Sequence, residues 1–235
     1  MAQRAARMNA HKRQSVPVRS MQAWLRDALS GVAQPTTVNE IAQLTAKWSI
    51  SKREHLAIEC ARSLLSEAAH DENVRILLAK GIVALLPDSM TQVEQLLNSK
   101  SREAAEAQFS LFAFLDDAAP RLKRAEDRKK VLRLVLDYLL GAKHNVAWAP
   151  WMAGDLLGDH WPFDESTPLL MEAAKHGRFV AGREAALHGI SQALERVPKQ
   201  LQWELVGTLK TVAVTDRSAR LRRYAQALLT DLRRV

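Results

Sequence analysis

Segments with the apolar spacing of an α-helix follow one another along this chain, and each is separated from the next by only a few residues. Apolar side chains recur every three or four positions in segments that cover residues 18–32, 51–69, 71–86, 89–98, 101–118, 124–140, 147–158, 166–176, 180–197, 199–214 and 216–233. Connections this short force neighbouring helices to lie antiparallel. The sequence therefore predicts an all-α fold, namely an α-solenoid of stacked antiparallel helix pairs.

Composition and local signals favour helices over strands. β-branched residues are sparse, whereas Ala, Leu, Arg and Glu are abundant, a balance that favours helix. Thr37 followed by Glu40 has the pattern of a capping box, which predicts a further helix start. Pro150 is expected to kink or restart its helix. The glycines at expected helix C-caps are Gly141, Gly158 and Gly177.

The predicted domain organisation is a basic flexible arm, residues 1–17, followed by a single HEAT-like helical domain, residues 18–235. The arm lacks the apolar core of a signal peptide, and no apolar stretch of the chain is long enough to span a membrane. A transit peptide would share the arm's basic, acid-poor composition, so organelle import stays an alternative to the expected cytoplasmic location. The single cysteine, Cys60, has a helical core spacing and is expected to pack in the interior.

Two segments resemble the start of the second helix in HEAT repeats, where an Asp is followed after two residues by a small apolar residue and an Arg. They are Asp71-Glu72-Asn73-Val74-Arg75 and Asp216-Arg217-Ser218-Ala219-Arg220. The Asp can cap the helix N-terminus, and the Arg can bond to neighbouring turns and tie repeats together. The resemblance covers about residues 37–234, with varying spacing between units. It implies a HEAT-like (HEAT or armadillo-type) array, an architecture that says almost nothing about function.

The net charge of +8 is concentrated in three clusters. Residues 1–20 carry +5, residues 121–130 carry +4 and residues 216–234 carry +4, which leaves about −5 for the rest of the chain. Local clusters attract polyanions more strongly than dispersed charge does. The alternative is that each cluster is a solvated helix end that complements the helix dipole. The candidate binding residues in these clusters are Arg4, Arg7, Lys12, Arg13, Lys123, Arg124, Arg128, Arg220, Arg222 and Arg223.

Residues 148–162 are unusual because they hold three of the six tryptophans. Trp151, Asp155 and Asp159 lie four positions apart and are expected to share one helix face. An aromatic ring beside a carboxylate can hold a cationic or stacked ligand, so Trp151 and Asp155 are candidate binding residues. The interpretation that we favour is that the tryptophans pack between helix layers and that Asp159 ends the helix.

The spacing of Trp151 and Asp155 is also similar to that in DNA glycosylases that remove alkylated purines and are themselves basic HEAT-like solenoids. The resemblance implies that Asp155 would stabilise the positive charge that develops on the sugar. The surrounding sequence departs from that family, because Trp151-Met152 stands where those enzymes have a Trp-Asp pair. A Trp four residues before an Asp carries little weight by itself.

The sequence contains no His-Glu-x-x-His or cysteine–histidine spacing for zinc, no glycine-rich phosphate loop and no Gly-x-Ser-x-Gly elbow. We therefore predict no catalytic residue, metal ligand or cofactor. The preferred hypothesis is a non-enzymatic scaffold that binds a protein partner, one with an acidic face, within a larger assembly. The alternative is a nucleic-acid-binding protein, at the extreme an alkylpurine glycosylase-like enzyme. Basic clusters 121–130 and 216–234 that lie together on the face of Trp151 would favour nucleic acid.

Overall fold

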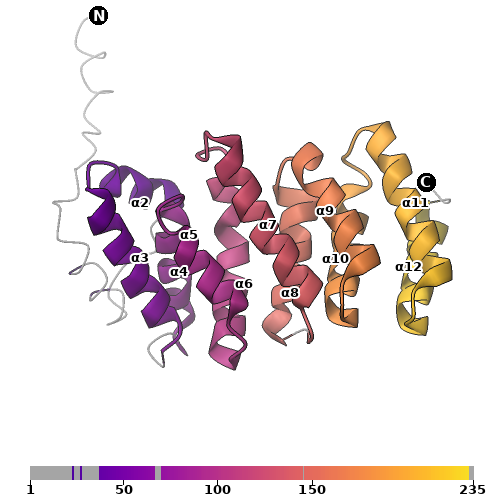
Figure 1. The fold of residues 1–235 in the computed structure, drawn as a ribbon, viewed down its shortest axis with the longest axis horizontal. Helices are drawn as coiled ribbons and strands as arrows, with labels where there is room; N and C mark the ends of the chain where they lie inside the picture. Colours follow the sequence, from indigo (N-terminus) through magenta and orange to yellow (C-terminus); the bar gives the residue numbers. More distant parts are fainter. Residues whose placement is uncertain (1–22, 24–26, 28–36, 67–69, 145, 233–235) are drawn as a thin grey trace, which may run out of the picture.

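The computed structural model describes residues 23, 27, 37–66, 70–144 and 146–232, and these residues are predominantly helical (Figure 1). Within them there are eleven α-helices, α2 to α12, and no strand. The prediction of an all-α protein is therefore confirmed. The predicted arm at residues 1–17, with Arg4, Arg7, Lys12 and Arg13, lies outside the described residues, as does most of the helix predicted at 18–32. No helix in the described ranges is both long and apolar enough to cross a membrane.

The helices succeed one another with short turns between them. Their bounds are α2 (Val38–Thr45), α3 (Ile50–Leu64), α4 (Glu72–Ala84), α5 (Met90–Asn98), α6 (Arg102–Leu115), α7 (Ala125–Gly141), α8 (Ala149–Asp155), α9 (Phe163–His176), α10 (Val180–Ala193), α11 (Lys199–Thr215) and α12 (Ala219–Leu232). Single turns of 3-10 helix, η3 (Asp116–Ala118) and η4 (Val146–Trp148), follow α6 and precede α8. A π-helical turn, η5 (Leu156–His160), continues α8.

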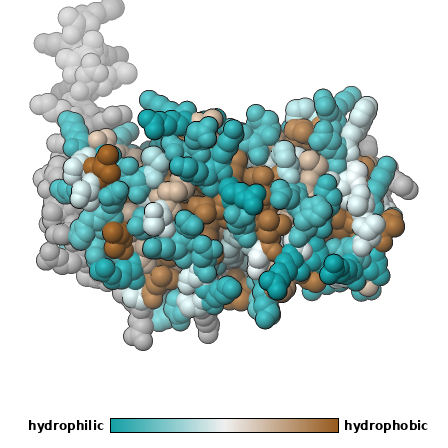
Figure 2. Space-filling model, in the orientation of Figure 1, coloured by the Kyte–Doolittle hydropathy of each residue, from teal (hydrophilic) through white to brown (hydrophobic). Residues whose placement is uncertain are grey.

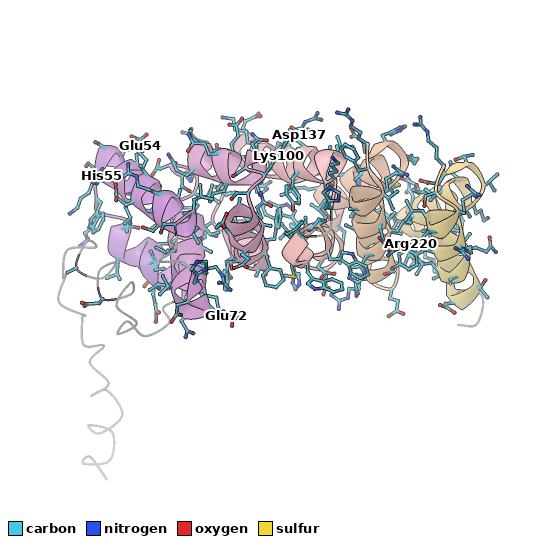
Figure 3. All side chains as sticks on the ribbon, turned by 90° about the horizontal axis from the view of Figure 1, so that it is seen from below. Glu54, His55, Glu72, Lys100, Asp137 and Arg220 are labelled. Atoms are coloured by element: carbon cyan, nitrogen blue, oxygen red, sulfur yellow. The ribbon has the colours of Figure 1, made fainter. Side chains whose placement is uncertain are left out.

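The helices form two rows. In the first row α3, α5, α7, α9 and α11 contact one another in succession, and in the second row α4, α6, α8, α10 and α12 do the same. Each first-row helix also contacts the second-row helix that follows it in the chain. Figure 3 shows Glu54 of α3 and Asp137 of α7 along one side of the molecule and Glu72 of α4 on the opposite side. The buried Leu, Val, Ile and Ala side chains form one continuous cluster.

The turns fall on two edges of the rows. The turns between α7 and α8, α9 and α10, and α11 and α12 lie along the edge drawn lowest in Figure 1, which we call the lower edge. Helices α7, α9 and α11 begin at the opposite, upper edge. On the face drawn in Figure 2, hydrophilic residues intersperse with smaller hydrophobic areas. The unusual features of this molecule lie at these edges and on the second row of helices.

Most helix starts follow the signals in the sequence. The capping box at α2 is formed, because the Glu40 N–H donates to Thr37 Oγ1 and the Thr37 N–H donates to Glu40 Oε2. The Asp71 carboxylate caps α4 by accepting from the N–H groups of Asn73 and Val74. Pro150 lies in the first turn of α8, so the predicted restart at this proline is also confirmed.

Several predicted boundaries are wrong. The helix predicted at 180–197 ends at Ala193, and Gly141 is the last residue of α7 while Ala142 is its C-cap. The helix predicted at 166–176 begins three residues earlier, at Phe163, and Pro168 lies inside it. Asp164 and Glu165 in the first turn complement the positive end of the helix dipole. Gly158 is not a C-cap but lies buried within the π-helical turn. The helix predicted at 51–69 ends at Leu64, and the N–H of Leu65 bonds back to the last turn.

Cys60 is fully buried in the core, as its spacing predicts. Desolvation by burial, with a smaller effect of the Glu59 charge, raises the pKa of the thiol to about 12. A thiol with so high a pKa stays protonated and is a poor nucleophile. Cys60 is therefore a packing residue.

Arginines connect helices that are neighbours within each row. Arg75 of α4 pairs with Glu106 of α6 at 3.1 Å, and Arg220 of α12 pairs with Glu184 of α10 at 2.5 Å. Both arginines come from the Asp-x-x-small-Arg segments, and each forms an ion pair with the neighbouring helix of the second row. Further links join Arg53 to Asp88, Arg128 to Glu165, and Arg183 to Asp216.

Helices α8 and α10 approach each other at backbone contact distance. A Cβ atom added to Gly154 would collide with the carbonyl oxygen of Ala185, and one added to Gly158 would collide with that of Gly189. In the other direction, a Cβ on Gly189 would collide with the Gly154 carbonyl oxygen and lie 2.7 Å from Leu170 Cδ2. Real Cβ atoms do not approach backbone this closely, so only glycine fits these positions.

We predict that Gly154→Ala lowers the free energy of unfolding by about 1–3 kcal/mol, the usual cost of forcing a methyl group into filled space. Urea unfolding followed by circular dichroism measures the change. Gly207→Ala is the matched control, because a Cβ added there in the middle of α11 meets nothing within 4 Å. That variant should gain about 0.5–1 kcal/mol from helix propensity. Equal effects of the two substitutions would contradict the close contact of α8 and α10.

Candidate binding site on helices α8, α10 and α12

Trp148 stands at the surface in an unusual backbone conformation. It is the last residue of η4 and the N-cap of α8, with φ of 60° and ψ of 9°, in the left-handed region. Left-handed backbone is rare for a bulky side chain and costs on the order of 1–3 kcal/mol. The side chain gains little from burial, since Trp148 is 62% exposed. The prediction that the tryptophans pack between helix layers is wrong for Trp148, although it holds for Trp161, which is 2% exposed.

Trp151 connects Trp148 to α10. The rings of Trp148 and Trp151 meet edge to face, with centroids 5.7 Å apart and an interplanar angle of 82°. The other neighbour of Trp151 is the imidazole of His188 in α10, at a centroid distance of 4.1 Å and an angle of 36°. Trp151 is half-buried in this arrangement. The three rings thus contact one another in series, from the exposed indole of Trp148 to His188 at the contact between α8 and α10.

His188 also engages the carboxylate of Asp155. Nε2 of His188 lies 2.8 Å from Oδ1 of Asp155, and both side chains keep some solvent exposure. Trp151 and Asp155 therefore share one face of α8, as predicted, and both touch the same residue of α10. Asp159 departs from the predicted face, because it lies in the π-helical turn and forms an ion pair with Arg196.

Tyr224 of α12 lies within range of the Asp155 charge. Burial raises the pKa of the Tyr224 phenol, the hydrogen bond with Ser191 lowers it, and the charges of Glu184 and Asp155 raise it further. The net shift is upward, so the phenol stays neutral at physiological pH. Glu184 is in turn paired with Arg220, whose side chain is 70% exposed. We call Trp148, Trp151, Asp155, His188 and Tyr224 the aromatic cluster.

The close contact of α8 and α10 puts the cluster together. His188 directly precedes Gly189, one of the glycines that let the two backbones touch. The backbone of His188 therefore lies close to α8, and its side chain reaches Trp151 and Asp155. The π-helical turn begins directly after Asp155. Such turns are rare and occur frequently at functional sites.

The residues of the cluster differ in how far they are open to solvent. The described residues contain no group of three or more His, Cys, Asp or Glu side chains that could hold a metal ion. Asp155 and the ring of Trp151 are both occupied by His188. Trp148, in contrast, presents most of its surface to solvent. Exposed tryptophan of this kind is enriched at the energetic centres of protein interfaces.

Six of the basic candidates lie among the described residues, and three of them bind other groups of the protein itself. Arg128 pairs with Glu165 and donates to the Leu122 carbonyl. Arg220 pairs with Glu184, and Arg222 donates to the Asp216 carbonyl. The remaining three are exposed: Lys123, Arg124 and Arg223.

The two described basic clusters lie on opposite edges. Residues 121–130 surround the start of α7 at the upper edge, whereas residues 216–223 surround the start of α12 at the lower edge (Figure 1). They do not form one basic surface around Trp151. The residues outside the described ranges hold eight of the 34 Lys and Arg but one of the 26 Asp and Glu, so the described residues carry a formal charge of +1.

The sequence pattern indicated Trp151 and Asp155 but not Trp148, His188 and Tyr224 as parts of one cluster. His188 and Tyr224 come from helices distant in sequence from α8, and apolar periodicity does not encode such proximity. Trp148 contacts Trp151 locally, but its exposure accompanies a left-handed backbone that the pattern does not indicate. One local signal was present for His188, since a histidine followed by Gly189 inside a helix marks a place of close packing.

We predict a favourable coupling between Asp155 and His188 of about 0.5–1.5 kcal/mol, the usual range for one hydrogen bond. The measurement is a double-mutant cycle of urea unfolding with Asp155→Ala, His188→Ala and the double variant. Additive effects of the two single substitutions would show that the contact contributes nothing to stability.

Comparison with protein-family models, with curated proteins and with solved structures finds no match for this chain.

Proposed function

We propose that this protein is a non-enzymatic, HEAT-like α-solenoid scaffold that binds a protein partner within a larger assembly. The two rows of helices, the short turns and the arginine links between consecutive helices support the architecture. An array of this kind offers an extended surface on which a partner can lie.

The single observation that carries the proposal is the placement of Trp148. Trp148 has a left-handed backbone and an exposed indole, and its ring meets that of Trp151 edge to face. The strained backbone of an exposed aromatic residue costs free energy in the unbound protein. Burial of the ring by a partner offsets that cost. The partner therefore docks on the second row at α8, with Trp148 as its anchor.

Nucleic acid is the second candidate function, and the charge distribution argues against it. A duplex needs a continuous basic track that contacts successive phosphates. The described basic clusters lie on opposite edges, and half of their candidate residues are engaged internally. The basic arm, with Arg4 and Arg7, is the remaining place for nonspecific contacts with phosphates.

The glycosylase-like alternative depends on Asp155. In such an enzyme the carboxylate must face the sugar, whereas here Oδ1 of Asp155 lies 2.8 Å from Nε2 of His188 and the Trp151 ring is covered by the same residue. We predict that neither the native protein nor Asp155→Asn releases methylated purines from alkylated DNA. Base release by the native protein that Asp155→Asn abolishes would establish the enzyme and overturn the scaffold proposal.

The partner proposal is tested by affinity purification of the tagged full-length protein from its native cells, with and without nuclease. We predict that a nuclease-resistant protein copurifies with the native chain and that Trp148→Ala reduces its recovery by at least about tenfold, the loss expected from a hot-spot residue. Trp203→Ala is the matched control, because Trp203 of α11 is 77% exposed and lies outside the aromatic cluster. Recovery that nuclease abolishes, or that both substitutions reduce equally, would contradict the proposal.

A further inference from the structure

A basic groove opens on the lower edge, one helix pair beyond the aromatic cluster. It lies between the turn from α9 to α10 and the turn from α11 to α12, and its volume is about 700 Å³. Its lining includes Lys175, His176, Arg178, Arg183 and Arg217 but a single carboxylate, that of Asp216. The groove is therefore a cavity whose lining holds more basic than acidic side chains.

The one carboxylate of the groove is neutralised within the protein. Nε and Nη2 of Arg183 donate to the two carboxylate oxygens of Asp216 at 2.7 and 3.1 Å, and Nη1 donates to the Gly177 carbonyl. Burial would raise the pKa of Asp216, but the hydrogen bonds from Arg183 and from the Ser218 N–H, with the Arg183 and Arg222 charges, lower it. Asp216 is thus ionised and its charge is balanced by Arg183.

The cations of the rim have no such partner. Lys175, Arg178 and Arg217 are exposed, and none of them forms an ion pair with a carboxylate in the part of the chain that the structure describes. Lys175 lies in the last turn of α9, where a positive charge complements the helix dipole without any ligand. That explanation does not extend to Arg178 and Arg217, which lie in the turns. The groove therefore presents unbalanced positive charge to solvent.

Apolar groups stand beside these cations. The Arg178 guanidinium lies over the Phe179 ring at 5.2 Å, and Val180, the next residue, is 38% exposed. Val212 of α11 contributes to the opposite wall. A mixture of guanidinium groups and apolar surface suits a ligand with carboxylates on a partly apolar chain.

We propose that this groove binds an acidic segment of the partner protein, with its Asp or Glu carboxylates held by Arg178, Arg217 and Lys175. The proposal rests on the scaffold function proposed above and names the chemistry of the partner. A nucleic acid is the less suitable occupant, because the groove is confined between two turns and the cluster at 121–130 lies on the opposite edge.

The experiment measures binding of a fluorescein-labelled hexaglutamate peptide to the full-length protein by fluorescence polarisation, at low and at physiological salt. The groove variant is Arg178→Glu with Arg217→Glu. The matched control is Lys123→Glu with Arg124→Glu, which changes the net charge equally but on the upper edge. We expect the groove variant to bind at least about tenfold more weakly and the control to change less than about threefold, since nearby charges dominate the attraction.

Several results would overturn the proposal. Absence of binding, or equal losses in the two variants, would show that the groove does not select acidic peptide. Tighter binding of a ten-residue oligothymidylate that is lost in the groove variant would assign the groove to phosphate. Equally tight binding of hexaglutamine would show that carboxylates are not recognised. Arg178→Gln with Arg217→Gln, a milder change at exposed positions, should give an intermediate loss if the fold is intact.

The outcome is separable from that of the scaffold proposal. Loss of the copurifying protein in Trp148→Ala together with unselective hexaglutamate binding would retain the scaffold and reject the groove. Groove-dependent hexaglutamate binding without any copurifying partner would retain the groove as a carboxylate site and reject the scaffold.

Discussion

The backbone contact between α8 and α10 is the constraint on which the candidate site depends. Helices normally pack with their axes 8–10 Å apart, separated by side chains. Here Gly154 and Gly158 of one segment and Gly189 of the other remove those side chains, so the backbones touch. Residues that flank the glycines, such as Asp155 and His188, are then brought within hydrogen-bond distance. The aromatic cluster is a consequence of this contact.

Charge plays a different part in the structure from the one that the sequence indicates. Arg128, Arg183 and Arg220 each connect one helical element to another through a carboxylate. Such pairs fix the register of neighbouring helices, because guanidinium and carboxylate groups require a defined geometry. A count of basic residues therefore overstates the charge that is free to meet a partner. Arg178 and Arg217, which form no described ion pair with a carboxylate, lie in turns.

The helices could be predicted from the sequence because apolar periodicity and capping act within a few residues. The Thr37–Glu40 capping box and the restart at Pro150 are local in this sense. The π-helical turn could not be predicted, since it depends on how Asp159 and Gly158 fit against α10. The same holds for the site. Spacing placed Trp151 and Asp155 on one face, but the residue that joins them comes from another helix.

The two proposed contact points belong to one edge of the molecule. Trp148 ends the turn that follows α7, and the groove begins at the turn that follows α9. A backbone hydrogen bond of 2.9 Å from the Arg178 N–H to the Leu140 carbonyl joins the second turn to the last residues of α7. A partner segment with carboxylates in the groove would thus be held at a fixed offset from the exposed indole. A segment that joins an acidic stretch to an apolar residue, in either chain direction, is the pattern that can occupy both at once, because the cations attract carboxylates and the ring packs against apolar groups.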